Sequence, residues 1–194
     1  NIGNATTGTV TLDNAVKISG TADDVTAALV TTDSKVVAGH TGTIANVTTT
    51  VTAEQGAGYT TINNVNATFS SGVEDSTANL TKNATEISDN LDTITNFDTS
   101  TDITITDADY DSTNNDNSVL ATRLSAIGNA TTGTVTVTNA VRVEGSQAQV
   151  TAALVTTDSL VEVSDASVKI TDADFSANTN NVTIAASDLK NIGN

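Results

Sequence analysis

Four residue types are missing from this sequence of 194 residues: cysteine, proline, methionine and tryptophan. Without cysteine, the chain can form neither a disulfide framework nor a thiolate zinc site. Aromatic residues make up only 3% of the chain, so its apolar share depends on Ala, Val, Ile and Leu, which bury less area per residue. We therefore expect a thin core rather than a thick globular one.

Cationic side chains are also scarce. Seven Lys and Arg residues face 23 Asp and Glu residues, which gives a formal net charge of -16. Nucleic acids and anionic lipids need a cationic face on their protein partner, so we expect neither as a partner. No window approaches the roughly 18 apolar residues of a membrane span, and no signal-peptide pattern is present, so we expect no membrane insertion.

Residues that carry catalysis are few. His40 is the only histidine, and no spacing or motif places a nucleophile or an orienting partner beside it, so we interpret it as an exposed loop residue. The sequence contains no Gly-x-Ser-x-Gly elbow, no P-loop and no dinucleotide-binding glycine motif. We therefore predict that the chain is not an enzyme.

What the sequence does contain is an internal repeat. The ten residues IGNATTGTVT occupy positions 2–11 and again 127–136, and IGN returns at 192, with a divergent copy, INN, at 62. ITDADY at position 105 recurs as ITDADF at position 170, and Val25–Ser34 is identical to Val150–Ser159. These spacings predict repeat units at 1–61, 62–126 (divergent) and 127–191, with 192–194 beginning a further unit. We expect the polypeptide to continue beyond both ends, or identical chains to follow one another head to tail.

Strands and helices can be predicted within the third unit. Four segments alternate apolar and polar residues with a period of two and are rich in β-branched residues, which indicates short strands at 134–138, 140–145, 160–163 and 167–170. Residues 146–154 read as a short helix with Ser146 and Gln149 as a capping box, and Thr21 and Asp24 repeat the pattern in the first unit. A second short helix is expected near 187–194, with Ser187 as its N-cap and Gly193 as a left-handed C-terminal residue.

Helices of about two turns and strands this short are unstable alone, so each unit should pack on its neighbour. The pattern therefore predicts a mainly β repeat protein, an elongated solenoid of short strands with two-turn helices, and an α/β solenoid is the variant of that prediction.

An acidic run supplies the best candidate site. Asp107, Asp109 and Asp111 stand at alternate positions and are followed by Asp116, a spacing that could gather oxygen ligands around calcium. The alternative is a solvated turn whose Asp and Asn side chains bond their own backbone. No other cofactor is expected.

The combination of ITDAD, VTIAASDLKNIGNATTGTVTV and GSQAQVTAAL resembles the Thr-, Asp- and Asn-rich repeats of very large bacterial surface proteins, notably from cyanobacteria and marine bacteria. That resemblance implies an adhesin, a surface layer or an extracellular fibre, and hence an extracellular or cell-surface location. Many members of this group carry glycine-rich calcium turns, which this chain lacks.

We therefore expect a structural repeat segment of an extracellular filament, a surface layer or an adhesin stalk. Its partners would be copies of itself, or adjacent repeats of the same chain, stacked head to tail. The alternative is a binding module, either a phage or bacterial fibre that contacts a glycan or an ice-binding coil whose Thr-x-Thr segments, at 48–52 and 134–138, order water.

Overall fold

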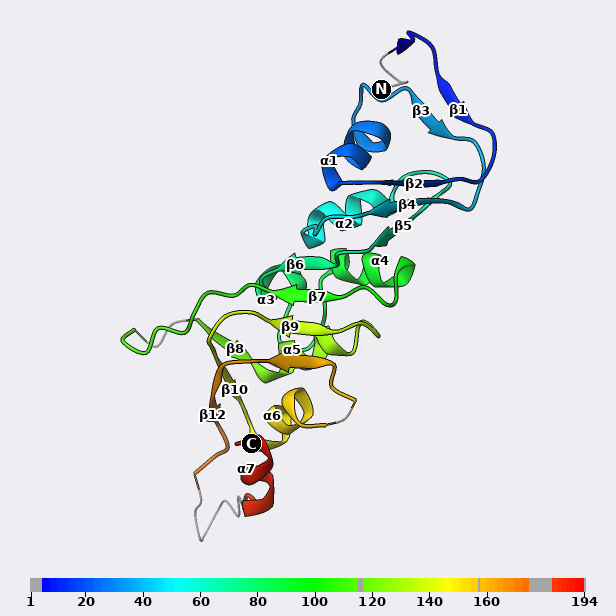
Figure 1. The fold of residues 1–194 in the computed structure, drawn as a ribbon. Helices are drawn as coiled ribbons and strands as arrows, with labels where there is room; N and C mark the ends of the chain where they lie inside the picture. The colour runs from blue at the N-terminus through cyan, green and yellow to red at the C-terminus, as the bar shows by residue number, and fades with distance from the viewer. Residues whose placement is uncertain (1–4, 115–116, 157, 175–182, 194) are drawn as a thin grey trace. The chain divides into compact units, whose positions relative to one another are not determined.

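The computed structural model describes residues 5–114, 117–156, 158–174 and 183–193 (Figure 1). The chain forms two compact units. Unit 1 comprises Asn1–Glu74 and Asp89–Ile103, and unit 2 comprises Asp75–Ser88 and Thr104–Asn194. The chain passes between the units three times: within β6 (Val73–Asp75), between Ser88 and Asp89, and within β7 (Ile103–Ile105).

Unit 1 alternates short strands and short helices. Its remaining elements are β1 (Val10–Leu12), β2 (Lys17–Gly20), α1 (Ala22–Val25), the π-helical segment η2 (Thr26–Val30), β3 (Val36–Ala38), β4 (Thr43–Val47), α2 (Ala53–Thr60), β5 (Val65–Phe69) and α4 (Asp89–Phe97). The strands form two parallel sheets, β1-β3 and β2-β4-β5.

Unit 2 follows the same alternation. Its elements are α3 (Thr77–Leu80), β8 (Ser118–Leu120), α5 (Ala121–Gly128), β9 (Val135–Val137), β10 (Val141–Gly145), α6 (Gln147–Leu154), β11 (Val161–Val163), β12 (Ala166–Ile170) and α7 (Ala186–Ile192). One sheet has the order β12-β10-β8, and in the other β9 lies between β11 and β7, with β6 beyond β7.

The structure is thus an α/β protein with four small parallel sheets, 30% helical and 28% strand. The prediction of a mainly β solenoid, with its α/β variant, is wrong. Part of the physical reason lies in the divergent segment 62–126. There α4 (Asp89–Phe97) buries Leu91, Ile94 and Thr95 at helical spacing, and this helix was not recognised in the sequence.

Two segments of the chain fold alike. β1 pairs with β3 in the register Val10↔Val36, and β9 pairs with β11 in the register Val135↔Val161, 125 positions later in both strands. The strands predicted at 134–138, 140–145, 160–163 and 167–170 are confirmed as β9, β10, β11 and β12. Repetition of the sequence therefore produces repetition of strand pairing.

Alternating side chains build the core of unit 2. Val135 and Val137 of β9 and Val143 of β10 are fully buried, while the residues between them are partly exposed. Leu124 and Ile127, three positions apart on α5, are also fully buried. Core side chains of this size suit the thin core that the low aromatic content predicted.

Helix ends follow the predicted capping only in part. The capping box of Ser146 and Gln149 at α6 is confirmed, and Thr21 accepts a hydrogen bond from the Asp24 N–H at the start of α1. The N-cap predicted at Ser187 is wrong, because α7 begins at Ala186 with Ala185 as its N-cap. Gly193 has a φ of -89°, so the predicted left-handed conformation is also wrong.

Gly72 illustrates a local requirement for glycine in the turn between β5 and β6. Its φ is +76°, and a Cβ atom placed there would lie 2.4 Å from the carbonyl oxygen of Asp102. Any other residue would be strained by the backbone conformation and would collide with a neighbouring backbone.

Candidate functional site

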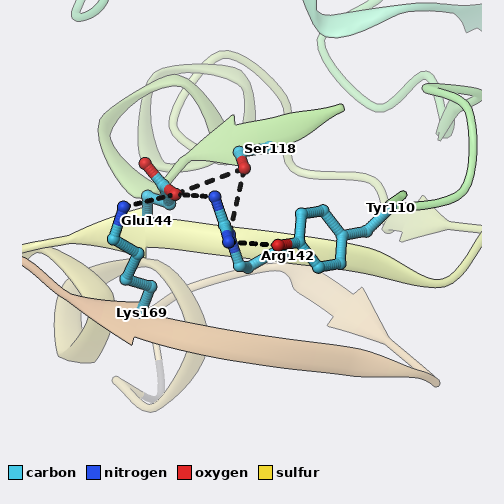
Figure 2. Close-up of polar contacts among 5 residues, drawn as sticks. All are labelled: Tyr110, Ser118, Arg142, Glu144 and Lys169. Carbon is cyan, nitrogen blue, oxygen red and sulfur yellow. Dashed lines mark hydrogen bonds and ion pairs between the residues drawn. The ribbon is translucent and has the colours of Figure 1, made fainter. Parts of the chain in front are cut away.

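A group of interacting polar side chains in unit 2 lies on the sheet β12-β10-β8. We call it the Arg142 cluster; it comprises Tyr110, Ser118, Arg142, Glu144 and Lys169 (Figure 2). The guanidinium of Arg142 lies 4.2 Å from the centroid of the Tyr110 ring and donates to the Tyr110 hydroxyl. Arg142 also donates through Nε to Ser118 Oγ at 3.1 Å.

Strand register explains how these residues meet. Arg142 of β10 is opposite Ser118 of β8, and Glu144, two positions later, is opposite Lys169 of β12. Residues two apart on a strand point to the same side of the sheet, so all four side chains share one face. The chain brings them together from segments up to 51 positions apart (Ser118 to Lys169).

Charge neutralisation dominates the electrostatics of the cluster. Glu144 Oε1 forms ion pairs with Arg142 and, at 3.2 Å, with Lys169, and the Glu144 side chain is 19% exposed. Burial acts to raise the pKa of Glu144, but the Lys169 hydrogen bond and the charges of Arg142 and Lys169 outweigh it and lower the pKa below its ordinary value.

This arrangement is suited to holding strands together. A carboxylate whose pKa is lowered is a weak base, and the Ser118 hydroxyl already donates to Glu144 at 3.3 Å while it accepts from Arg142. The cluster joins three parallel strands through charged side chains, which is a structural use of polar groups.

Two of the predicted calcium residues bind backbone groups of other segments. Asp107 accepts from the Thr77 N–H at 2.7 Å and from the Thr77 hydroxyl at 2.9 Å, at the first residue of α3. Asp109 accepts from the Ala140 N–H at 2.9 Å, just before β10. These two carboxylates therefore connect consecutive segments of unit 2.

The side chain of Asp111 bonds to groups nearby in the sequence. It accepts from the Thr113 N–H at 2.8 Å and from Asn114 Nδ2 at 2.8 Å, and these hydrogen bonds lower the pKa of its carboxyl. The fourth predicted ligand, Asp116, lies outside the described residues. Among the residues that the structure describes, no three His, Cys, Asp or Glu side chains are grouped as metal ligands. Calcium at this run stays a prediction.

The role of the repeated ITDAD motif was missed in the sequence. Asp172, the counterpart of Asp107 65 positions later, accepts from the Gln147 N–H at 2.6 Å, and Gln147 is the first residue of α6. In both copies the same Asp therefore binds a helix N-terminus of the preceding segment, where a negative charge is favoured. The signal was its recurrence at the repeat spacing.

His40 is exposed, and its Nδ1 lies 2.6 Å from the carbonyl oxygen of Thr41 in the adjacent turn. No helix among the described residues has the length and apolar character that crossing a membrane requires. Comparisons of the chain with protein-family models, with curated proteins and with solved structures gave no match.

Proposed function

We propose that this chain is a structural repeat segment of an extracellular filament, a surface layer or an adhesin stalk, without catalytic activity. Its work is mechanical, and within each unit strands of one strand–strand–helix segment pair with strands of a neighbouring segment. Its partners are copies of itself or adjacent repeats of the same chain, arranged head to tail, and its location is extracellular or at the cell surface.

One observation carries the proposal: the side chains that recur with the repeat are the ones that join consecutive segments. Asp107 and Asp172 each bind a helix N-terminus in the preceding segment. The parallel pairing of β1 with β3 returns unchanged in β9 with β11. Residues that repeat together with their contacts maintain an architecture, whereas a catalytic site needs to occur only once.

The polar side chains on the sheets support the same role. In unit 1, Asn46 donates to Ser19 at 3.2 Å and accepts from Thr68 at 2.9 Å, which links three neighbouring strands. The Arg142 cluster does the same in unit 2. Side chains that bond to each other across strands stiffen a sheet and leave few groups to recognise a ligand. The net charge of -16 favours a soluble, well-hydrated surface.

Immunogold electron microscopy of the cells that produce the protein tests this proposal. An antibody against the folded chain should label fibres or a layer outside the cell envelope. Label confined to the cell interior would contradict it. The binding alternative has its own readout: saturable binding of the purified chain to a glycan panel, or thermal hysteresis in ice, would favour a binding module instead.

A further inference from the structure

On one side of unit 1, apolar side chains are partly exposed whose counterparts in the later repeat are buried. Val135 and Val143 are fully buried in unit 2, whereas their counterparts 125 positions earlier, Val10 and Ile18, are partly exposed. The neighbouring sequences are closely similar, so composition does not explain the difference. What differs is the neighbour on one side.

Strand pairing identifies that neighbour. β9 lies between β7 and β11, and β10 lies between β8 and β12 (Figure 1). Among the described residues, β1 pairs only with β3, and β2 pairs only with β4. β1 and β2 therefore lack the partners that β7 and β8 provide to their copies. We call these open edges, with Val10, Leu12 and Ile18, the N-terminal face.

The hydrogen-bonding direction of β2 agrees with an open edge. The N–H groups of Ile44 and Thr48 donate to the carbonyls of Val16 and Gly20, so the even-numbered residues of β2 bond to β4. In a parallel ladder the intervening residues, Lys17 and Ser19, direct their N–H and C=O groups to the opposite side. Their counterparts, Arg142 and Glu144, are aligned there with Ser118 and Leu120 of β8.

The complementary surface lies at the other end of the chain. α7 repeats α5 after 65 positions, yet Leu124 of α5 is fully buried while its counterpart Leu189 is 46% exposed. Beside α7 lies a groove of about 590 Å³, lined by side chains that include Val163, Val168, Ile170, Leu189 and Ile192. On one side β12 pairs with no strand among the described residues, and we call that side its free edge. The groove, this free edge and residues 183–185 together form what we call the C-terminal face.

The free edge of β12 has the required register. The Thr171 N–H donates to the Gly145 carbonyl, so the backbone N–H and C=O groups of the odd-numbered residues of β12 point to β10. The backbone groups of Val168 and Ile170 point away from β10. Ile105, the counterpart of Ile170, accepts from the Thr138 N–H at 3.3 Å, at the end of β9. The carbonyl of Ile170 is thus placed to accept in the same way from the N–H of Asp13, the residue that corresponds to Thr138 in the first repeat.

We infer that the C-terminal face of one molecule binds the N-terminal face of a second copy of this chain, head to tail. β1 of the second copy pairs with Val168–Ile170, as β9 pairs with β7, and its β2 pairs with residues 183–185, as β10 pairs with β8. The inference deepens the proposed function and rests on it for biological meaning, but the surfaces follow from the structure.

The head-to-tail contact would also reproduce one polar contact that is present within unit 2. Asp109 accepts from the Ala140 N–H within unit 2. Its counterpart Asp174 is exposed, and the counterpart of Ala140 is Ala15. In the head-to-tail contact the Asp174 carboxylate accepts from the Ala15 N–H of the second copy. The contact therefore combines strand pairing, apolar burial and one charge-assisted hydrogen bond.

Complementary variants test the polarity of the contact. Leu189→Asp places a charge on the C-terminal face, and Ile18→Asp places one on the N-terminal face. In sedimentation velocity over a concentration series, the unaltered chain should form oligomers, and each variant alone should associate at least about tenfold more weakly. An equimolar mixture should form a heterodimer and nothing larger, because one intact pair of faces remains. Phe97→Asp, at an apolar residue that is 44% exposed on α4, is the matched control and should associate normally.

A cross-link tests the register directly, and the absence of native cysteine makes it unambiguous. Glu144 is opposite Leu120 in unit 2. Their repeat counterparts are Ser19 and Ala185, which are both exposed and would be opposite each other across the head-to-tail contact. A chain carrying Ser19→Cys and Ala185→Cys should form a ladder of disulfide-linked oligomers on mild oxidation. A chain carrying Leu120→Cys and Glu144→Cys should close its disulfide within one molecule, which shows that this geometry permits the bond.

Each outcome decides the inference. A chain that stays monomeric at the highest concentration, or a mixture of the two Asp variants that stays monomeric while both fold by circular dichroism, overturns it. The inference is also overturned if the internal disulfide of the Leu120→Cys and Glu144→Cys chain forms but the Ser19→Cys and Ala185→Cys chain gives no cross-link between molecules. Association without extracellular immunogold label would contradict the proposed function and leave the contact intact. Label without association would leave the function and reject the contact.

Discussion

The hydroxyl of Tyr59 donates to the carbonyl oxygen of Ala22 at 3.0 Å and lies 2.7 Å from Thr26 Oγ1. The π-helical segment η2 begins at Thr26, the residue whose side chain meets Tyr59. In unit 2 the corresponding Thr151 accepts instead from Gln147 Nε2, and α6 stays α-helical through Leu154. A side chain that bonds into the first turn can thus alter the helix that follows.

Tyr59→Phe should lower the free energy of unfolding by about 1–2 kcal/mol, because Tyr59 is 2% exposed and its ring packing is retained while two hydrogen bonds are lost. Chemical denaturation measures the change. We also expect the amide pattern of Thr26–Val30 to move toward that of α6 in NMR spectra. A variant with unchanged stability would show that the hydroxyl contributes no net stabilisation.

Matched substitutions in α5 and α7 should separate burial from residue type. Leu124→Ala should cost about 2–5 kcal/mol, because Leu124 is fully buried and its removal leaves a cavity. Leu189→Ala, at the equivalent repeat position, should cost less than about 1 kcal/mol when measured in dilute solution. Equal losses at both positions would mean that α7 is covered within the single molecule.

Glu144 should make stability depend on pH. Its folded-state pKa lies below the ordinary value, so its stabilisation is present above that value and is lost as the pH falls through the folded-state pKa. Glu144→Gln should flatten the stability profile between about pH 5 and pH 3, by about 0.5 kcal/mol given the exposure of Lys169. Glu162→Gln, at an exposed residue on β11, is the control. A parallel shift in both variants would assign the effect to net charge.

The repeated Asp of ITDAD should stabilise helix N-termini. Asp172→Ala removes the acceptor for the Gln147 N–H and should lower stability by about 1 kcal/mol, with loss of amide protection at the start of α6. Asp33→Ala, in an exposed turn, should have little effect on either readout. Unchanged protection at Gln147 would reject a capping role for Asp172.

The predicted calcium site has a direct readout. If Asp107, Asp109, Asp111 and Asp116 bind calcium, millimolar calcium should raise the thermal midpoint of the chain relative to the same chain with chelator. Asp111→Asn should remove that increase, while the midpoint without calcium should change little, since the Asp111 side chain bonds to the nearby residues Thr113 and Asn114. A midpoint that ignores calcium would favour the solvated-turn interpretation of this run.

The positions of strands and helices in the third unit could be predicted because period-two alternation and a capping box act locally. The contact partners could not. The sequence grouped Asp107 and Asp109 as possible calcium ligands or as part of a solvated turn, and it did not predict their hydrogen bonds to Thr77 and Ala140, 30 and 31 positions away. The Arg142 cluster was not predicted either, because its side chains meet through the register between strands, which the sequence does not show.

The identical segments Val25–Ser34 and Val150–Ser159 show most directly what the sequence determines and what the tertiary structure decides. Both carry a short helix, which local propensity and capping by Thr21 or Ser146 determine. Only the tertiary structure decides that one contains a π-helical stretch beside Tyr59 and that Ala153 is fully buried while Ala28 is partly exposed. The same sequence has two outcomes because the energies of burial and hydrogen bonding depend on the neighbours that each copy meets.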